Sequence, residues 1–396
     1  MRGSMNTTIQ FHTNTPPPKD ESLVPIIEKV TNEKSLSADD GMLLYETADL
    51  WTVCSLADSV RRKLHGNTAF YNINRHVNYS NVCALSCMFC DFYRKNNQEG
   101  AYAHSIEDIS NEATQALSTG ATEMHIVGGL HPWLPFSYYT QMLSTIKEIA
   151  PNIHIKAFTA VEIVHLARIS KRGRDGIAGI ASVLRELVDA GLGSLPGGGA
   201  EVFDERIHDE AFRGKIKGEQ WLDVHRVAHE LGLNSNATML YGHIETREDR
   251  IKHMLTIREE QERAIASGSS GKFQAFIPLP FIPGVSDLSH LPGPSGVENL
   301  RTIAVSRLIL DNVPHIKAFW IMQTLHMAQH MLECGADDID GTVMWYDITK
   351  VESNSTHQES SVVDLCRAIR DAGFDPVERD TLYRNVTRDG TNWSVR

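Results

Sequence analysis

The chain lacks any hydrophobic run long enough to cross a membrane. Nothing in its 396 residues approaches the roughly 20 consecutive apolar residues that span a bilayer. The N-terminus also has no apolar core of the kind found in secretory signal peptides. Instead, Met1-Arg2-Gly3-Ser4 precedes a second methionine, Met5, a pattern typical of an expression leader. These absences predict a cytoplasmic protein without a membrane span.

Basic residues are scarce relative to acidic ones. The sequence has 38 Lys and Arg against 50 Asp and Glu, which gives a formal net charge of −12. This charge opposes non-specific attraction to nucleic acid or to an anionic membrane. We therefore expect no nucleic-acid partner, and a small-molecule substrate suits the composition better.

Cysteine is also scarce, and its distribution is uneven. Of the six cysteines, three lie close together as Cys83, Cys87 and Cys90, while the others are scattered singly. A zinc site normally needs four closed ligands in separated pairs, and no second pair is present. A disulfide framework does not suit a long acidic chain without a secretion signal. Three thiolates on one loop instead predict three ligands of a 4Fe-4S cluster, with one iron left open.

Composition and periodicity divide the chain into three parts. Residues 1–20 are polar and rich in proline, which predicts a flexible lead-in. Residues 21–66 have a helical pattern, with Leu56, Val60 and Leu64 at four-residue steps, and predict an N-terminal helical cap. Residues 67–396 predict the main domain with a C-terminal extension. With 41% hydrophobic residues, the chain could form one large α/β domain or two smaller ones.

In the main domain, short β-like runs alternate with longer helical patterns. The expected strands are 71–82, 123–128, 154–159, 193–197, 236–241, 273–278, 315–321 and 338–343. The expected helices are 106–118, 136–149, 180–190, 220–231, 246–266, 297–310, 323–334 and 362–372. Eight repeats of strand and helix predict an α/β fold of the (β/α)8 TIM-barrel type, and an open doubly wound sheet is the alternative. In such a barrel the cysteine loop follows the first strand, at the end where functional loops gather.

The cysteine spacing, with the aromatic residue Phe89 just before the third cysteine, resembles the radical S-adenosylmethionine (SAM) superfamily. The resemblance implies that the amino and carboxylate groups of SAM bind the open iron. One electron from the cluster would then cleave SAM to a 5'-deoxyadenosyl radical, and Phe89 would lie beside the adenine. The turn Gly128-Gly129, after the second strand, would hold the methionyl amino group, with an ordinary turn as the alternative.

Two further features suggest contacts with SAM. Glu162, just past the third strand, could accept hydrogen bonds from ribose hydroxyls, or it could be a carboxylate at the start of a helix. Gly198 lies within three consecutive glycines after the fourth strand. Such a run favours close contact between the backbone and a ligand.

The third predicted strand contains a lysine, Lys156, that could bind an anionic substrate. Alternation along 154–159 predicts that His154, Lys156 and Phe158 share one face, which in a barrel is the lumen. A buried lysine needs either an ion-pair partner or an anionic ligand, because desolvating an unpaired charge is costly. Lys156 is therefore a candidate for binding a substrate carboxylate, with a structural ion pair as the equal alternative.

Four other polar residues are candidates for substrate binding or catalysis. His243, at the end of the fifth strand, could transfer protons or bind an anion, or it could be structural. Gln274 and Asp340 interrupt apolar strand patterns, so they bond either to a ligand or to the protein itself. Arg94 is the cation nearest to the cysteine loop in the sequence, and an exposed loop arginine is the alternative.

Longer stretches between about residues 55 and 384 carry a closer resemblance. The menaquinone-pathway radical enzymes and the deazaflavin-cofactor synthases share the patterns at 55–63, 78–83, 195–201 and 242–246. Finer matches resemble the aminofutalosine synthase family, and they lie at 125–132, 154–162 and 314–320. Phe319 stands where tyrosine is common in this family, which is a conservative departure.

The closer resemblance implies one step of menaquinone biosynthesis. The 5'-deoxyadenosyl radical would add to the enol-ether double bond of 3-[(1-carboxyvinyl)oxy]benzoate. Aryl migration and loss of CO2 or bicarbonate would then give 6-amino-6-deoxyfutalosine and methionine. The implied partners are this acceptor, a one-electron donor such as flavodoxin or ferredoxin, and a second copy in a homodimer.

Three other functions remain as alternatives at this point. The first is a radical SAM cyclase of the cyclic dehypoxanthine futalosine synthase type, which abstracts hydrogen. The second is a non-catalytic iron–sulfur protein for electron transfer, which would need a fourth cluster ligand. The third is a radical enzyme that modifies nucleic acid, which the acidic balance disfavours.

Overall fold

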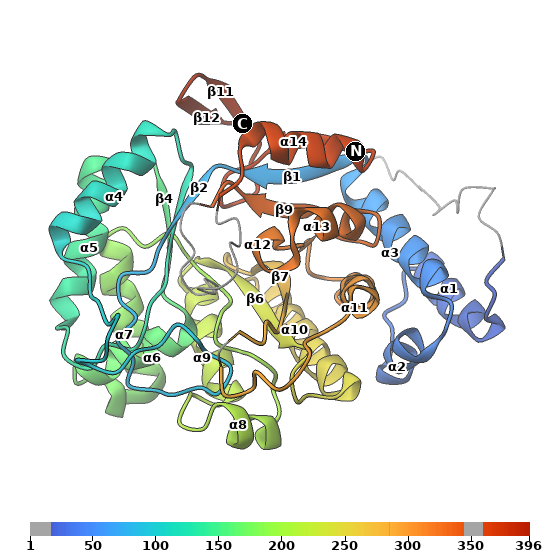
Figure 1. Ribbon diagram of the computed structural model, residues 1–396, viewed down its shortest axis with the longest axis horizontal. Coiled ribbons are helices and arrows are strands. Elements are labelled where there is room, and N and C mark those ends of the chain that lie inside the picture. The colour runs from blue at the N-terminus through green and yellow to red at the C-terminus, as the bar shows by residue number, and fades with distance from the viewer. Residues whose placement is uncertain (1–16, 285, 344–358) are drawn as a thin grey trace.

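A parallel sheet of seven strands forms the centre of the fold (Figure 1). The computed structural model describes residues 17–284, 286–343 and 359–396, so the predicted lead-in lies outside the described residues up to residue 16. The strands pair in chain order: β2 (Asn74–Val77), β3 (Glu123–Ile126), β4 (His154–Ala157), β5 (Ser194–Leu195), β6 (Asn234–Tyr241), β7 (Phe273–Pro280) and β8 (His315–Ile316).

The sheet curls until its two ends meet through further strands. β9 (Asp338–Gly341) joins the β8 end through a parallel bridge between Lys317 and Asp338. β9 also pairs with β1 (Thr68–Asn72), and β1 leads through Ile73 into β2. The prediction of a (β/α)8 barrel is confirmed. The predicted strand over 71–82 is instead two strands, because the chain changes pairing partners at Ile73.

Helices follow the strands and cover the outside of the sheet (Figure 1). They are α4 (Ile106–Ser118), α5 (Phe136–Ile149), α6 (Ala160–Ile169), α7 (Gly176–Asp189), α8 (Glu205–Ala211), α9 (Gly218–Glu230), α10 (Arg247–Ala266), α11 (Gly296–Ile309), α12 (Trp320–Gln323) and α13 (Leu325–Leu332). Ser105 and Asp108 form a capping box that starts α4, and Thr246 and Asp249 do the same for α10. None of the helices described combines the length and apolarity that a membrane span requires.

Two predictions of secondary structure were wrong, one for a strand and one for a helix. The predicted strand over 315–321 ends at Ile316, and α12 begins at Trp320, whose indole nitrogen donates to the Gly341 carbonyl at 2.8 Å. Helix α6 was not predicted at all. Its residues 160–167 are buried on every side, so its sequence has no polar face to reveal a helical period.

The N-terminal region is helical, as its pattern predicts. It comprises α1 (Val24–Thr31), α2 (Ala38–Glu46) and α3 (Leu50–His65), and α3 packs against α11. The predicted stripe on α3 is partly wrong, because Leu64 is exposed whereas Arg61 is buried. The Arg61 guanidinium donates to the carbonyls of Ala336, Gly66 and Thr68 and thus ties α3 to the barrel.

The C-terminal segment closes the N-terminal end of the barrel. After α14 (Val362–Asp371), β10 (Asp375–Glu378) pairs with β1, and a hairpin of β11 (Val386–Asp389) and β12 (Asn392–Val395) follows. Between them, Arg379 and Thr381 enter the lumen. Arg379 forms an ion pair with Asp338 at 2.8 Å, and the Thr381 carbonyl accepts from Gln274 at 2.9 Å.

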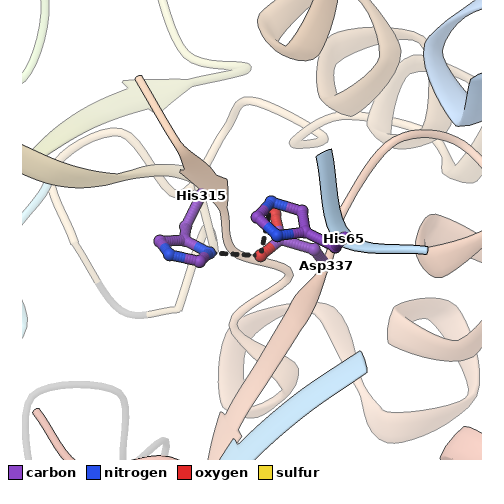
Figure 2. A group of neighbouring side chains, drawn as sticks. All are labelled: His65, His315 and Asp337. Atoms are coloured by element: carbon purple, nitrogen blue, oxygen red, sulfur yellow. Dashed lines mark hydrogen bonds and ion pairs between the residues drawn. The ribbon is translucent and has the colours of Figure 1, made fainter. Parts of the chain in front are cut away.

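A second polar cluster lies at the N-terminal ends of β8 and β9, away from the strand ends that carry functional loops (Figure 2). Asp337 accepts from His315 at 2.6 Å and from Arg307 at 2.7 Å, and His65 lies 3.6 Å from the same carboxylate. His65 and His315 carry atoms that can bind metals. Both oxygens of Asp337 already accept hydrogen bonds, however, so we interpret the cluster as structural.

We expect Arg61→Leu to destabilise the fold strongly. The substitution removes a fully buried guanidinium and leaves three backbone carbonyls without their donor, one in a buried bond and two in part-buried bonds, which costs about 3 kcal/mol of the free energy of unfolding. Arg62→Ala is the matched control, because Arg62 pairs with Asp58 at the surface and should contribute less than about 1 kcal/mol. Urea unfolding measures both values, and equal losses would contradict the assigned role of Arg61.

Candidate active site

A cavity of about 300 Å³ opens at the C-terminal ends of the strands. Loops after β2, β3, β4 and β5 form its rim, and side chains from β3, β6, β7 and the end of β9 form its floor. Its predicted members are Cys83, Cys87, Cys90, Phe89, Gly128, Gly129, Glu162, Gly198 and Asp340. The barrel therefore brings nine of the thirteen candidate residues into one cavity, at the end of the barrel where catalytic loops gather.

The three clustered cysteines line this cavity together and are half-buried. Burial raises the pKa of Cys87 to about 11 and also raises the pKa of Cys90. The Cys83 sulfur accepts backbone N–H groups of Leu85 and Leu130, each at 3.4 Å. Buried thiols with raised pKa values become thiolate ligands when a metal displaces their protons. These three residues fit a metal cluster held at three corners, and no fourth cysteine of the described chain lines the cavity.

The Gly128-Gly129 turn packs directly against the cysteine loop. A Cβ atom on Gly129 would lie 2.4 Å from the Val82 carbonyl oxygen, and one on Gly128 would lie 2.7 Å from the Tyr79 ring. The Gly129 N–H donates to the Ser80 carbonyl at 2.7 Å. Only glycine permits this approach, so the turn fixes where the cysteine loop lies.

Gly198 lies in a similarly close turn after β5. A Cβ atom on Gly198 would meet the Thr159 methyl group at 3.0 Å, and one on the preceding Gly197 would meet the Asn236 carbonyl at 2.6 Å. The backbone at Gly198 therefore faces the cavity without a covering side chain, as the sequence predicts. Contact between Gly198 and SAM stays a prediction.

Glu162 reaches the cavity, but the protein already uses both of its oxygens. One accepts from the Tyr79 hydroxyl at 2.9 Å and from the Gly128 N–H at 3.1 Å. The other accepts from the backbone and hydroxyl of Thr159 in the capping box of α6. These contacts match the alternative prediction, in which Glu162 is a carboxylate at the start of a helix. Burial raises the pKa of Glu162 to about 7, against the lowering effect of its hydrogen bonds.

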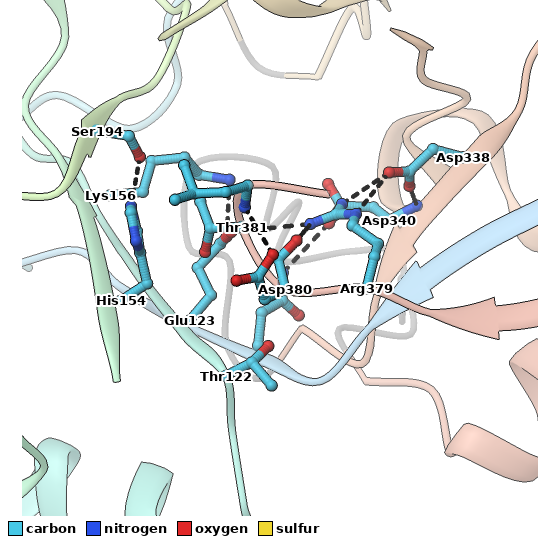
Figure 3. A network of polar contacts seen from close by, with 12 residues as sticks. Thr122, Glu123, His154, Lys156, Ser194, Asp338, Asp340, Arg379, Asp380 and Thr381 are labelled. Atoms are coloured by element: carbon cyan, nitrogen blue, oxygen red, sulfur yellow. Dashed lines mark hydrogen bonds and ion pairs between the residues drawn. The ribbon is translucent and has the colours of Figure 1, made fainter. Parts of the chain in front are cut away.

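Lys156 faces the barrel lumen, as alternation predicts, and has a partner there (Figure 3). Its ammonium lies 2.7 Å from the Glu123 carboxylate, which comes from the neighbouring strand β3. Burial opposes ionisation of Glu123, but Lys156, Arg379 and Lys317 together hold its pKa well below the usual value. Lys156 is not among the residues that line the cavity, so a contact with substrate stays a prediction.

The prediction that Phe158 shares the lumen face with Lys156 was wrong. β4 ends at Ala157, and Phe158 has a positive φ of 62°, which breaks the strand alternation. The Phe158 ring packs against Tyr139 of α5, with 5.7 Å between the ring centroids. Phe158 therefore belongs to the layer between sheet and helices.

Three other candidates lie outside the cavity lining. The His243 ring is buried, and its Nε2 atom lies 3.1 Å from the Leu240 carbonyl. The Arg94 guanidinium donates to the carbonyls of Asp91 and Tyr93 and so stabilises the conformation of the cysteine loop. Gln274 donates to Asn236 and Thr381. These contacts match the structural alternatives, and catalytic roles for the three residues stay predictions.

Asp340 lines the floor of the cavity and is also held by the protein. It pairs with Lys317 at 3.2 Å and accepts from the Asn74 amide at 3.2 Å. Its φ of 71° is unusual for a residue other than glycine. Such backbone strain is typical of functional sites and here re-aims the carboxylate at the end of β9.

Lys215, Glu201 and His125 also line the cavity but were not predicted as site residues. Lys215 and Glu201 form a buried ion pair, and the Lys215 ammonium lies 5.3 Å from the centre of the Phe89 ring. His125 projects from β3 to the floor. Alternation along β3 places Glu123 and His125 on the lumen face, and this signal could have found His125. No sequence pattern around Lys215 indicates that its side chain reaches the cavity.

We expect Lys156→Met to destabilise the protein by about 3 to 5 kcal/mol. The substitution leaves the buried Glu123 carboxylate without its nearest cation, because Arg379 is 3.9 Å away. The double variant Lys156→Met/Glu123→Gln removes the uncompensated charge and should recover most of the loss. Urea unfolding tests both variants, and a single variant as stable as the parent would refute the pairing.

Glu162 should make stability depend on pH. Its folded pKa of about 7 exceeds the ordinary pKa of 4.5 for a glutamate, so its stabilising protonation is complete below pH 4.5 and is lost as pH rises through 7. Relative to Glu162→Gln, the parent should therefore lose about 3 kcal/mol of unfolding free energy across this window. Unfolding at several pH values measures the difference. Glu107→Gln, at an exposed position, is the control and should show no such trend.

Comparisons with known proteins agree with this geometry. Residues 77–257 match the radical SAM superfamily, and residues 270–390 match the CofH/MqnC C-terminal region. The chain is 41% identical to the aminodeoxyfutalosine synthase of Thermus thermophilus, over 93% of this chain and 97% of that protein. It is 42% identical to the aminodeoxyfutalosine synthase of Streptomyces coelicolor, over 90% of this chain and 92% of that protein.

Among solved structures, methylornithine synthase shares the fold. It aligns with a TM-score of 0.67 and 18% identity, over 89% of this chain and 97% of that one. This likeness shows the fold alone, whereas the sequence identities span both matched regions. The chain therefore belongs to the radical SAM superfamily and, within it, to the aminodeoxyfutalosine synthase family.

Proposed function

We propose that this protein transfers the 5'-deoxyadenosyl group of SAM to 3-[(1-carboxyvinyl)oxy]benzoate. The products are 6-amino-6-deoxyfutalosine, methionine and CO2 or bicarbonate. The observation that carries the proposal is the single cavity in which three cysteines face the Gly128-Gly129 turn above an apolar wall. Family membership at 41 and 42% identity supports the same reaction.

In this proposal Cys83, Cys87 and Cys90 hold a 4Fe-4S cluster, and SAM is the cosubstrate. The cluster supplies the single electron that cleaves SAM when it is bound and reduced. The cysteine loop keeps its place through Gly129 and Arg94, whose contacts fix its backbone. Phe89 and the backbone at Gly128 and Gly198 border the space for SAM.

Lys215 is the cation best placed for the methionyl carboxylate. Its ammonium is buried beside Phe89 and is paired with Glu201, and both residues line the cavity next to the cysteines. Glu201 has a positive φ of 50°, so the backbone holds its carboxylate in a strained position. A paired ammonium and carboxylate suit the carboxylate and the amino or hydroxyl groups of one ligand.

The rest of the cavity suits an aromatic acid. Val127, Ile277, Leu279, Leu240 and Phe319 supply its apolar wall. An apolar wall excludes water and would thereby protect a reactive carbon radical from quenching. The acceptor in this proposal combines one aromatic ring with two carboxylates, so polar groups are needed only at the two ends of the space.

The proposal also includes an electron donor, a cellular location and an oligomeric state. The one-electron donor is a flavodoxin or ferredoxin, the protein is cytoplasmic, and two copies form a homodimer. The domain division at residues 66 and 67 also stays a prediction. The competing function is the cyclase reaction on dehypoxanthine futalosine, which uses the same cluster but abstracts hydrogen.

Product analysis tests the proposal. We expect the anaerobically reconstituted, reduced protein to convert SAM and 3-[(1-carboxyvinyl)oxy]benzoate into a product that contains the adenosyl group, as detected by mass spectrometry. Dehypoxanthine futalosine should give only free 5'-deoxyadenosine or no reaction. Cys87→Ala should abolish iron binding and turnover, while Cys366→Ala, at a buried position away from the cavity, should retain both. Cyclisation of dehypoxanthine futalosine would replace the proposed function with the alternative.

A further inference from the structure

His125 occupies a distinctive place on the cavity floor. It lies in register with His76 of β2 and Lys156 of β4, so the three side chains form one row across neighbouring strands. The rings of His125 and His76 are 4.4 Å apart. His125 is half-buried and lines the cavity, whereas Lys156 lies outside the lining. The imidazole is therefore the member of this row that a ligand can reach.

Most polar side chains of the floor are already occupied. Asp340 is bonded to Lys317 and Asn74, and the Thr238 hydroxyl donates to the Gly197 carbonyl at 2.8 Å. The imidazole of His125, by contrast, makes no hydrogen bond to any residue in the described ranges. The amide nitrogen of Asn236 is also without an acceptor there, although its oxygen accepts from Gln274. Two donors therefore remain for a ligand at the floor.

The lysines behind His125 are not available to replace it. The lumen pairs Lys156 with Glu123, Lys317 with Asp340, and Arg379 with Asp338, so its charges balance. Burial, with the nearby His76 and Lys156, keeps the pKa of His125 well below its ordinary value. The groups that face it are His76, Lys156, Glu123 and Lys317. Near neutral pH its ring is uncharged and offers one N–H donor.

The depth of His125 indicates which part of the acceptor it meets. His125 lies on β3 and precedes Gly128, which follows the end of that strand, by three residues, a distance of roughly 10 Å along an extended chain. In the proposed reaction, the adenosyl group meets the enol ether at the end of the cavity that the cysteines and Gly128 line. The ring carboxylate, on the opposite side of the acceptor, then points toward the floor.

We propose that His125, assisted by the amide of Asn236, binds the aromatic carboxylate of the acceptor. This inference rests on the proposed function and specifies how the same cavity recognises its substrate. Lys156 stays paired with Glu123 in this arrangement and does not line the space for the carboxylate. The wall of apolar side chains between floor and rim then holds the aromatic ring.

Binding measurements on the reconstituted, unreduced holoprotein saturated with SAM test the proposal. We expect His125→Gln to raise the Kd for 3-[(1-carboxyvinyl)oxy]benzoate about tenfold or more, and His125→Phe to raise it further. The Kd for SAM and the melting temperature should not change. His154→Gln is the matched control, since His154 is a lumen histidine that bonds to Ser194 and does not line the cavity.

The outcomes separate this inference from the proposed function. If the parent protein turns over the acceptor and both His125 variants bind it as the parent does, the inference is overturned and the function stands. If His154→Gln weakens binding as much as His125→Gln, the effect is structural and the inference is also overturned. If the parent neither binds nor converts the acceptor, both proposals are overturned.

Two acceptor fragments identify the carboxylate. 3-Methoxybenzoate keeps the ring carboxylate, and 2-phenoxyacrylate keeps the enol-ether carboxylate. We expect His125→Gln to weaken binding of 3-methoxybenzoate and to leave 2-phenoxyacrylate unaffected. The opposite result would overturn the assignment of the aromatic carboxylate to His125.

Discussion

The balance of buried charge in the barrel lumen is the constraint on which the rest of the structure depends. Three cations and three carboxylates pair inside the ring of strands, and each pair joins different strands or loops. A barrel of this size is normally filled by apolar side chains. Here the lumen remains polar, and removing any one charge would leave its partner uncompensated in a dry environment. Of these six residues Asp340 alone also lines the cavity, so the buried ion pairs and the cavity floor meet at that carboxylate.

This arrangement explains why the lumen lysines do not serve as free anion receptors. Each lysine is held by its carboxylate partner. Burial, together with the nearby cations, lowers the pKa of the His125 ring, which is therefore neutral. The rim follows a different principle. There, Gly128 and Gly129 allow backbone segments to touch, so the cysteine loop is placed by close packing. Ion pairs fix the side chains at and behind the floor, whereas close backbone packing fixes the position of the rim.

Much of this site could be predicted from the sequence, because its main signals are local. The spacing of Cys83, Cys87 and Cys90 and the paired glycines are readable within a few residues, and the strand order follows from the alternation of elements. Pairings across the chain could not be predicted. Glu123 and Lys156 are 33 positions apart and meet only because β3 and β4 are in register. Lys215 reaches the cavity from a loop whose sequence has no periodic pattern.

The entry of Arg379 into the barrel has a consequence for biosynthesis. A ribosome produces β3, with Glu123, long before it produces the segment that carries Arg379, and β9 with Asp338 also comes earlier. Until that segment emerges, Asp338 lacks its arginine partner, and Glu123 has Lys156 but not Arg379 as a neighbouring cation. The lumen therefore acquires its full set of ion pairs only after translation has passed residue 379. The barrel lumen is thus completed only when nearly the whole chain has been synthesised.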